Sequence, residues 1–160
     1  MWIFEGYSMS HFKQNKVLII GIGNTLRGDD GIGAYICSRI EALHKEGVRT
    51  IIKQQLHMEM VEDFLAFDHI IITDASINKE AIQFGPVTSR EMAPVASSHH
   101  VNASLLAAVA KQLYNKELSL VICSVRGENF DMQEHLSAIA KANADLAVST
   151  ILQWMEDLDA

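Results

Sequence analysis

The chain has 160 residues, a formal net charge of −7 at pH 7 and 49% hydrophobic residues. This length fits one domain with a substantial core, and the composition is that of a folded globular protein rather than a disordered one. The acidic balance and the lack of any Lys/Arg cluster argue against a nucleic-acid partner. No apolar run approaches about 18 residues, so the sequence predicts no membrane span.

We divide the chain into an N-terminal extension, residues 1–15, and a single α/β domain, residues 16–160. The extension has no basic n-region and no sustained apolar h-region, so we expect that it is neither a secretory signal nor well ordered. Cys37 and Cys123 lie far apart and lack CxxC spacing. Buried, reduced thiols are therefore expected, which is consistent with a cytoplasmic protein.

The domain alternates short apolar runs with stretches of helical spacing. Continuous β-branched runs predict core strands, and apolar residues three and four apart predict helices. This alternation predicts a three-layer αβα sandwich with a twisted, mostly parallel five-stranded sheet. In chain order we expect a strand at residues 17–20, a helix at 32–46, a strand at 48–53, a short helix at 58–67, a strand at 70–73, a helix at 98–113, a strand at 118–125 and a helix ending near 158.

Three local signals refine this pattern. Pro86 makes residues 81–88 a poor central strand, so we assign them to an edge of the sheet, in antiparallel orientation. Ser98 is placed to cap the helix that follows it. Asp131, with Glu134 three residues later, resembles a capping box that opens the last helix.

The most informative stretch follows the first strand and reads Gly21-Ile-Gly-Asn-Thr-Leu-Arg-Gly-Asp-Asp-Gly-Ile-Gly33. The loop is not a dinucleotide-binding fingerprint, because Leu26 stands where that motif needs its third glycine and Lys53 stands where it needs an acidic residue. It is not a P-loop either, because the Gly-Lys-Ser/Thr sequence is missing. An acidic pair at a helix start would repel phosphate. The loop is therefore better suited to a cation.

Residues that could bind a metal or transfer a proton follow two predicted strands and begin one predicted helix, at the edge where ligands of α/β folds bind. Asp30 follows the first strand, Asp74 follows the third, and His99 or His100 begins a helix. Two carboxylates and an imidazole are a reasonable set of ligands for a divalent metal. Structural alternatives remain: Asp74 could form an Asx-turn, a His pair at a helix start is more often solvated, and we favour Asp29 as a helix cap or dipole partner.

These residues resemble one family, the hydrogenase maturation proteases, which are the endopeptidases that process nickel–iron hydrogenase large subunits. The glycine loop is similar to the family signature, and two weaker matches follow in the correct order. These are Ile70-Ile-Ile-Thr-Asp-Ala75 and Ser97-Ser-His-His-Val-Asn-Ala-Ser-Leu-Leu106. The resemblance spans the chain from Val17 to about Met155.

The resemblance implies the roles of individual residues. Asp30, Asp74 and His99 fall on the three residues that contact the metal and support catalysis in the family. The implied metal is nickel already installed in the substrate, the hydrogenase large-subunit precursor, from which a C-terminal peptide is cleaved. Because three ligands leave the site incomplete, we expect the isolated chain to bind nickel or another divalent metal only weakly. Residues 54–60 and 124–128 depart from the family pattern, so the sequence leaves the identity of the hydrogenase open.

Three alternatives remain beside this hypothesis. A metal-dependent hydrolase of the same fold, unrelated to hydrogenases, is the least firmly excluded. A response-regulator receiver would carry its acidic pair directly at the strand end, whereas eight residues from Gly21 to Gly28 intervene here. A receiver would also need a lysine after the last strand, where Val125 and Arg126 stand. A binding domain without catalysis is the third alternative, and retention of the two aspartates and His99 counts against it.

Overall fold

The computed structural model describes residues 15–87 and 98–160, and for residues 98–102 it describes the backbone alone. The predicted disorder of the extension concerns residues 1–14 and lies outside the described residues. Asn15, by contrast, is held in place, because its side-chain amide donates to the carbonyl of Leu158 at 3.2 Å.

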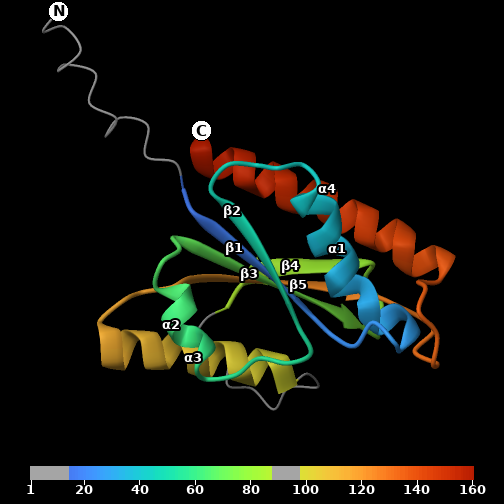
Figure 1. The fold of residues 1–160 in the computed structure, drawn as a ribbon, viewed down its shortest axis with the longest axis horizontal. Helices are drawn as coiled ribbons and strands as arrows, with labels where there is room; N and C mark the ends of the chain where they lie inside the picture. Colours follow the sequence, from blue (N-terminus) through green and yellow to red (C-terminus); the bar gives the residue numbers. More distant parts are fainter. Residues whose placement is uncertain (1–14, 88–97) are drawn as a thin grey trace, which may run out of the picture.

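A single five-stranded sheet runs through the molecule in the order β2-β1-β3-β5-β4 (Figure 1). Four strands are parallel, and β4 pairs antiparallel with β5 at the edge, as Pro86 predicted. This antiparallel edge distinguishes the sheet from the 2-1-3-4-5 order of receivers. The strands are β1 (Val17–Ile22), β2 (Val48–Lys53), β3 (His69–Ser76), β4 (Ile82–Pro86) and β5 (Ser119–Arg126).

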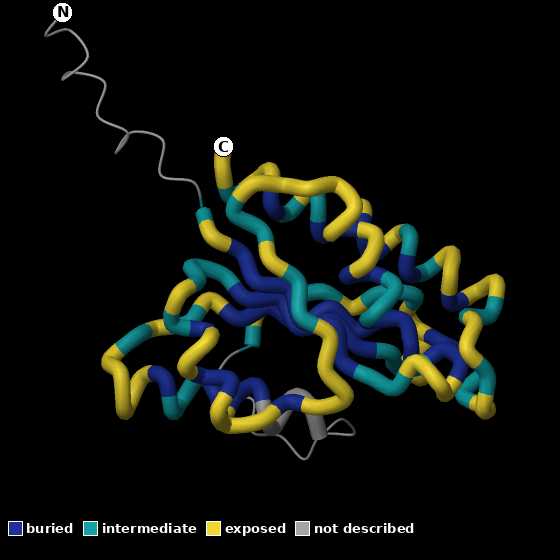
Figure 2. The backbone as a smooth tube through the Cα atoms, in the orientation of Figure 1, coloured by how far each residue is buried: buried dark blue, intermediate teal, exposed yellow. Residues whose placement is uncertain are grey.

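Helices cover both faces of the sheet, so the predicted three-layer sandwich is confirmed (Figure 1). Alternate residues of β1 enter the two cores: Ile19 packs towards α1 and α4, whereas Leu18 and Ile20 pack towards α2 and α3. Figure 2 shows β1, β3 and β5 as the buried centre of the molecule. The helices are α1 (Ile32–Glu41), α2 (Met60–Phe64), α3 (Ser98–Tyr114) and α4 (Ala138–Asp159), and the 3-10 helix η3 (Gly28–Gly31) precedes α1.

Several predicted boundaries were wrong. The first helix ends at Glu41 rather than near residue 46, and the chain then turns through His44 and Gly47, which both have positive φ angles. The third strand continues to Ser76, so Asp74 lies within it rather than after it. The last helix begins at Ala138, and its N-cap is Ser137. The capping box predicted at residues 131–134 is therefore wrong.

In the described parts of the chain, no helix is long and apolar enough to cross a membrane.

Candidate active site

The strand order switches at the carboxyl ends of β1 and β3, and we call this edge of the sheet the candidate crevice. These strands are neighbours, but the chain leaves β1 towards β2 on one side and returns to β3 on the other. Ligands of open α/β sheets bind where the strand order switches in this way. Asp30 lies in η3, which follows β1, and Asp74 lies near the carboxyl end of the neighbouring strand β3, so both predicted residues belong to the same edge of the sheet.

Glycines let the start of α1 approach the strand ends closely. A Cβ added at Gly33 would lie 2.7 Å from the backbone nitrogen of Ile22 and 2.9 Å from the carbonyl oxygen of Thr73. Real side chains do not tolerate such distances to backbone atoms. The helix therefore packs backbone to backbone against both β1 and β3, which keeps the Asp30 loop close to the end of β3.

Asp30 is partly exposed, and its orientation is fixed by its own loop. Its carboxylate oxygen Oδ2 accepts a hydrogen bond from the backbone N–H of Asn24 at 2.7 Å. Asn24 is a turn residue as well, because its Oδ1 accepts from the N–H of Leu26 at 2.9 Å. Gly23 adopts a φ of +137°, and a Cβ there would strike the carbonyl oxygen of Asp30. The loop thus folds tightly around this carboxylate.

Asp74 is almost buried, with a relative exposure of 8%. It sits opposite Ser124 in the β3–β5 ladder, and its Oδ1 accepts from the N–H of Ala75 at 2.8 Å. Because β3 continues through Ser76, the Asx-turn alternative for Asp74 is wrong. Residues 70 and 72 of β3 face the α2/α3 layer, and strand alternation places Asp74 on that same face.

His99 lies in the first turn of α3, but its side chain is outside the described residues. A helix that precedes a parallel strand starts at the carboxyl edge of the sheet, and α3 runs in that direction before β5 (Figure 1). Among the side chains that the structure describes, no group of three or more His, Cys, Asp and Glu residues is arranged to hold a metal ion. The triad of Asp30, Asp74 and His99 therefore stays a prediction.

Asp29 has a role that the sequence did not reveal. Its side chain is fully buried, and its carboxylate accepts four hydrogen bonds from a distant segment. Oδ2 accepts from the N–H groups of Glu128 and Asn129 at 2.8 Å each and from the Ser137 hydroxyl at 2.7 Å, and Oδ1 accepts from the Ser137 N–H at 2.7 Å. Burial alone would raise the pKa of Asp29, but these hydrogen bonds outweigh it and hold the pKa below the ordinary value.

The interpretation of Asp29 as a helix cap is therefore wrong, because no described side chain hydrogen-bonds to the N-terminus of η3 or α1. Although the residue lies in the first turn of η3, its carboxylate is turned away to residues 128–137. The sequence carried one weak signal of this contact in Gly127, because a Cβ there would lie 2.6 Å from the Asp29 Cβ. Since glycine often follows a strand simply to form a turn, Gly127 does not by itself predict a neighbour.

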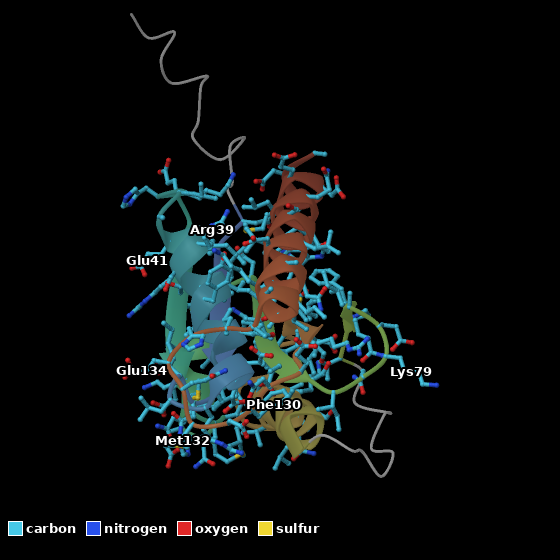
Figure 3. All side chains as sticks on the ribbon, turned by 90° about the vertical axis from the view of Figure 1, so that its right-hand side faces the viewer. Arg39, Glu41, Lys79, Phe130, Met132 and Glu134 are labelled. Atoms are coloured by element: carbon cyan, nitrogen blue, oxygen red, sulfur yellow. The ribbon has the colours of Figure 1, made fainter. Side chains whose placement is uncertain are left out.

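Residues 127–137, which connect β5 to α4, pack beside η3, and we call this segment the wall. The backbone N–H of Gly28 donates to the carbonyl of Gln133, and the N–H of Gln133 donates to the carbonyl of Leu26. Figure 3 looks onto this edge and shows Phe130, Met132 and Glu134 on the wall. A groove of about 430 Å³ lies between this wall, η3 and α1.

Neither cysteine is suited to act as a nucleophile. Cys37 and Cys123 are free thiols with no solvent exposure, as predicted. Burial raises the pKa of each to about 12. Since the thiolate is the nucleophile, both side chains are inert at neutral pH.

Comparison with known proteins gives a consistent result. No family model matches the chain. Two curated relatives from Methanocaldococcus jannaschii are named putative hydrogenase maturation proteases. One is 25% identical over 155 residues, which cover 89% of this chain and 90% of the relative. The other is 26% identical over 157 residues, which cover 88% of this chain and 96% of the relative. The predicted resemblance to hydrogenase maturation proteases is confirmed.

Solved structures share the fold. The hydrogenase maturating endopeptidase HybD from E. coli matches with a TM-score of 0.70 and 22% identity, covering 89% of this chain and 93% of its own. The [NiFe] hydrogenase maturation protease HycI from Thermococcus kodakarensis matches with a TM-score of 0.69 and 21% identity, covering 90% and 94%. These relatives are proteases, which is the enzyme class that the sequence predicted.

Proposed function

We propose that the chain is an endopeptidase that removes a C-terminal peptide from the large-subunit precursor of a nickel–iron hydrogenase after nickel insertion. The observation that supports the proposal is the placement of Asp30, in the turn after β1, and of Asp74, near the carboxyl end of the neighbouring β3, at the switch point of the sheet. The relatives named hydrogenase maturation proteases supply the substrate class.

In this proposal, nickel belongs to the substrate and is the feature that the enzyme recognises. The side chains of Asp30, Asp74 and His99 would contact it, and the donor set of two carboxylates and one imidazole suits a divalent transition metal. Asp30 is partly exposed at the crevice, so it is accessible to a metal carried by another protein. Because these three side chains would not complete the coordination of a free nickel ion, the enzyme would bind precursors that already contain nickel in preference to free metal.

Cleavage is proposed to use water rather than a side-chain nucleophile. Both thiols are buried and protonated, and the Ser137 hydroxyl donates to the buried carboxylate of Asp29, which already accepts three backbone N–H groups. A carboxylate at the crevice can accept a proton from the attacking water, and a metal near the scissile carbonyl can polarise it. The cytoplasmic location inferred from the reduced cysteines stays a prediction.

Mass spectrometry of a candidate large-subunit precursor tests the proposal directly. The precursor is incubated with the full chain, with and without prior nickel loading. We expect loss of a C-terminal peptide in the loaded sample only. Equal cleavage of both samples would favour a metal-dependent hydrolase that does not read nickel, and no cleavage of either would contradict the proposed activity on that precursor.

A further inference from the structure

The carboxylates of Asp29 and Asp30 in η3 bind two different parts of the molecule. The Asp29 carboxylate is turned to residues 128–137, whereas the Asp30 carboxylate is turned back to Asn24. In a 3-10 helix with three residues per turn, successive side chains point about 120° apart. Two adjacent carboxylates of one turn can therefore bind different parts of the molecule at the same time.

We propose that Asp29 is a positioning residue: it anchors η3 to residues 127–137 and thereby sets the orientation of the Asp30 carboxylate in the crevice. The proposal rests on the proposed function only for its catalytic consequence. We call the four hydrogen bonds that the Asp29 carboxylate accepts from Glu128, Asn129 and Ser137 the Asp29 clamp.

The first argument is the cost of burying a charge. A carboxylate without solvent exposure is tolerated only when hydrogen bonds replace its water shell. Asp29 accepts its four bonds at 2.7–2.8 Å, which are short distances typical of a charged acceptor. Three of the four donors are backbone N–H groups. The clamp therefore fixes the backbone of the wall and not merely its side chains.

The second argument is that η3 also donates hydrogen bonds to the wall, in addition to those that the Asp29 carboxylate accepts from it. The N–H of Asp29 donates to the carbonyl of Asn129 at 2.8 Å, and the N–H of Gly28 donates to the carbonyl of Gln133 at 2.8 Å. A Cβ on Gly127 would lie 2.6 Å from the Asp29 Cβ, so the surfaces are in close contact. Neither the turn nor the wall can shift without the other.

The third argument connects this anchor to Asp30. The N–H of Asp30 donates to the carbonyl of Arg27 at 3.1 Å, so its backbone belongs to the anchored turn. The Asp30 carboxylate accepts a hydrogen bond from the N–H of Asn24 at 2.7 Å. A change in the position of η3 would alter this bond. The N–H of Asn24 is therefore a natural reporter of the Asp30 orientation.

The experiment uses the full chain in three variants and a control. Asp29→Asn removes the charge and puts an amide group against N–H donors. Gly127→Ala keeps every hydrogen-bonding group but forces the two surfaces apart. Ser137→Ala removes one donor to Asp29 together with the N-cap acceptor of α4. Ser149→Ala, the control, removes a hydroxyl that donates to the carbonyl of Asp145 within α4. Circular dichroism gives the folded fraction of each variant.

The first readout needs no substrate. Backbone NMR follows the amides of Glu128 and Asn129, which report the clamp, and the amide of Asn24, which reports Asp30. We expect all three amides to shift and to exchange at least about tenfold faster in Asp29→Asn, with smaller changes in Ser137→Ala and none in Ser149→Ala. If the Asn24 amide stays unchanged while the other two respond, Asp29 does not position Asp30 and the proposal is overturned.

The second readout is cleavage of the nickel-loaded precursor. We expect kcat per folded molecule to fall about 100-fold in Asp29→Asn, since misplacing a reacting group by about 1 Å costs that much. KM should rise as well, because Asp30 would contact the nickel by which the precursor is recognised, and Gly127→Ala should also lose kcat. A normal kcat per folded molecule would overturn the proposal in favour of a purely structural Asp29. If wild-type protein cleaves no precursor, the proposed function fails, whereas the Asn24 amide still decides the positioning role.

Discussion

Asp29 and Ser137, 108 residues apart in the chain, are joined by two hydrogen bonds of 2.7 Å, one from the Ser137 N–H and one from its hydroxyl. The same hydroxyl accepts from the N–H of Ala140 at 3.2 Å and so caps α4. One serine thus starts the last helix and holds the buried carboxylate beside the crevice. The start of α4 and the geometry of the Asp30 turn are consequently coupled.

Alanine substitution of each predicted metal-contacting residue should abolish processing. We expect Asp30→Ala, Asp74→Ala and His99→Ala to lose at least about 100-fold in the rate of precursor cleavage, because each would remove one of three ligands. Gel-shift or mass-spectrometric assays of a co-expressed precursor measure this loss. His100→Ala is the matched control and should cleave nearly as fast as wild type. Normal trimming by any of the three variants would remove that residue from the triad.

Gly33 should not tolerate a side chain. The Cβ of Gly33→Ala would lie 2.7–2.9 Å from backbone atoms of Ile22 and Thr73, which cannot move aside as a side chain can. We expect a loss of about 1–3 kcal/mol in the free energy of unfolding, measured by urea denaturation. Gly85→Ala is the control, because nothing lies within 4 Å of its added Cβ. Equal stabilities of the two variants would contradict the close packing of α1 on the strand ends.

The stability contributed by Asp29 should disappear in acid. Its pKa in the folded chain lies below the ordinary value of 3.8, so the unfolded chain binds a proton more readily than the folded one. The contribution is therefore complete well above pH 3.8 and is lost as the pH falls through the ordinary value towards the lower folded pKa. Urea unfolding of wild type and Asp29→Asn from about pH 6 to about pH 2 should give stabilities that converge as the pH falls. A constant difference would mean that the charge of Asp29 is irrelevant to stability.

Thiol reagents should leave the folded protein unmodified. Burial raises the pKa of Cys37 and Cys123 to about 12, so the reactive thiolate is scarce at neutral pH and inaccessible to reagent. We expect the rate of labelling by a chromogenic disulfide to follow global unfolding, and precursor cleavage to survive treatment of the native enzyme. Denatured protein, as the control, should label at both cysteines. Rapid native labelling with loss of cleavage would reopen the possibility of a cysteine nucleophile.

Much of the architecture followed from local patterns. The apolar run at Val17 and the strands after it are recognisable because both faces of a parallel sheet are buried. Pro86 marked the antiparallel edge because it cannot donate to a central ladder. The end of the third strand was placed too early because Asp74 and Ser76 are polar, yet both lie inside a ladder with β5. Tertiary pairing outweighed composition at that position.

The layers, the antiparallel edge and the position of Asp30 in the loop after β1 could all be predicted from local patterns, because apolar periodicity and proline act over a few residues. The partner of Asp29 and the start of α4 depend on tertiary contacts. The sheet order brings residues 127–137 from β5, past β3, to the turn after β1. Once a carboxylate is buried there, its hydrogen bonds must come from whichever backbone the topology delivers, and no local pattern specifies a donor 108 residues away.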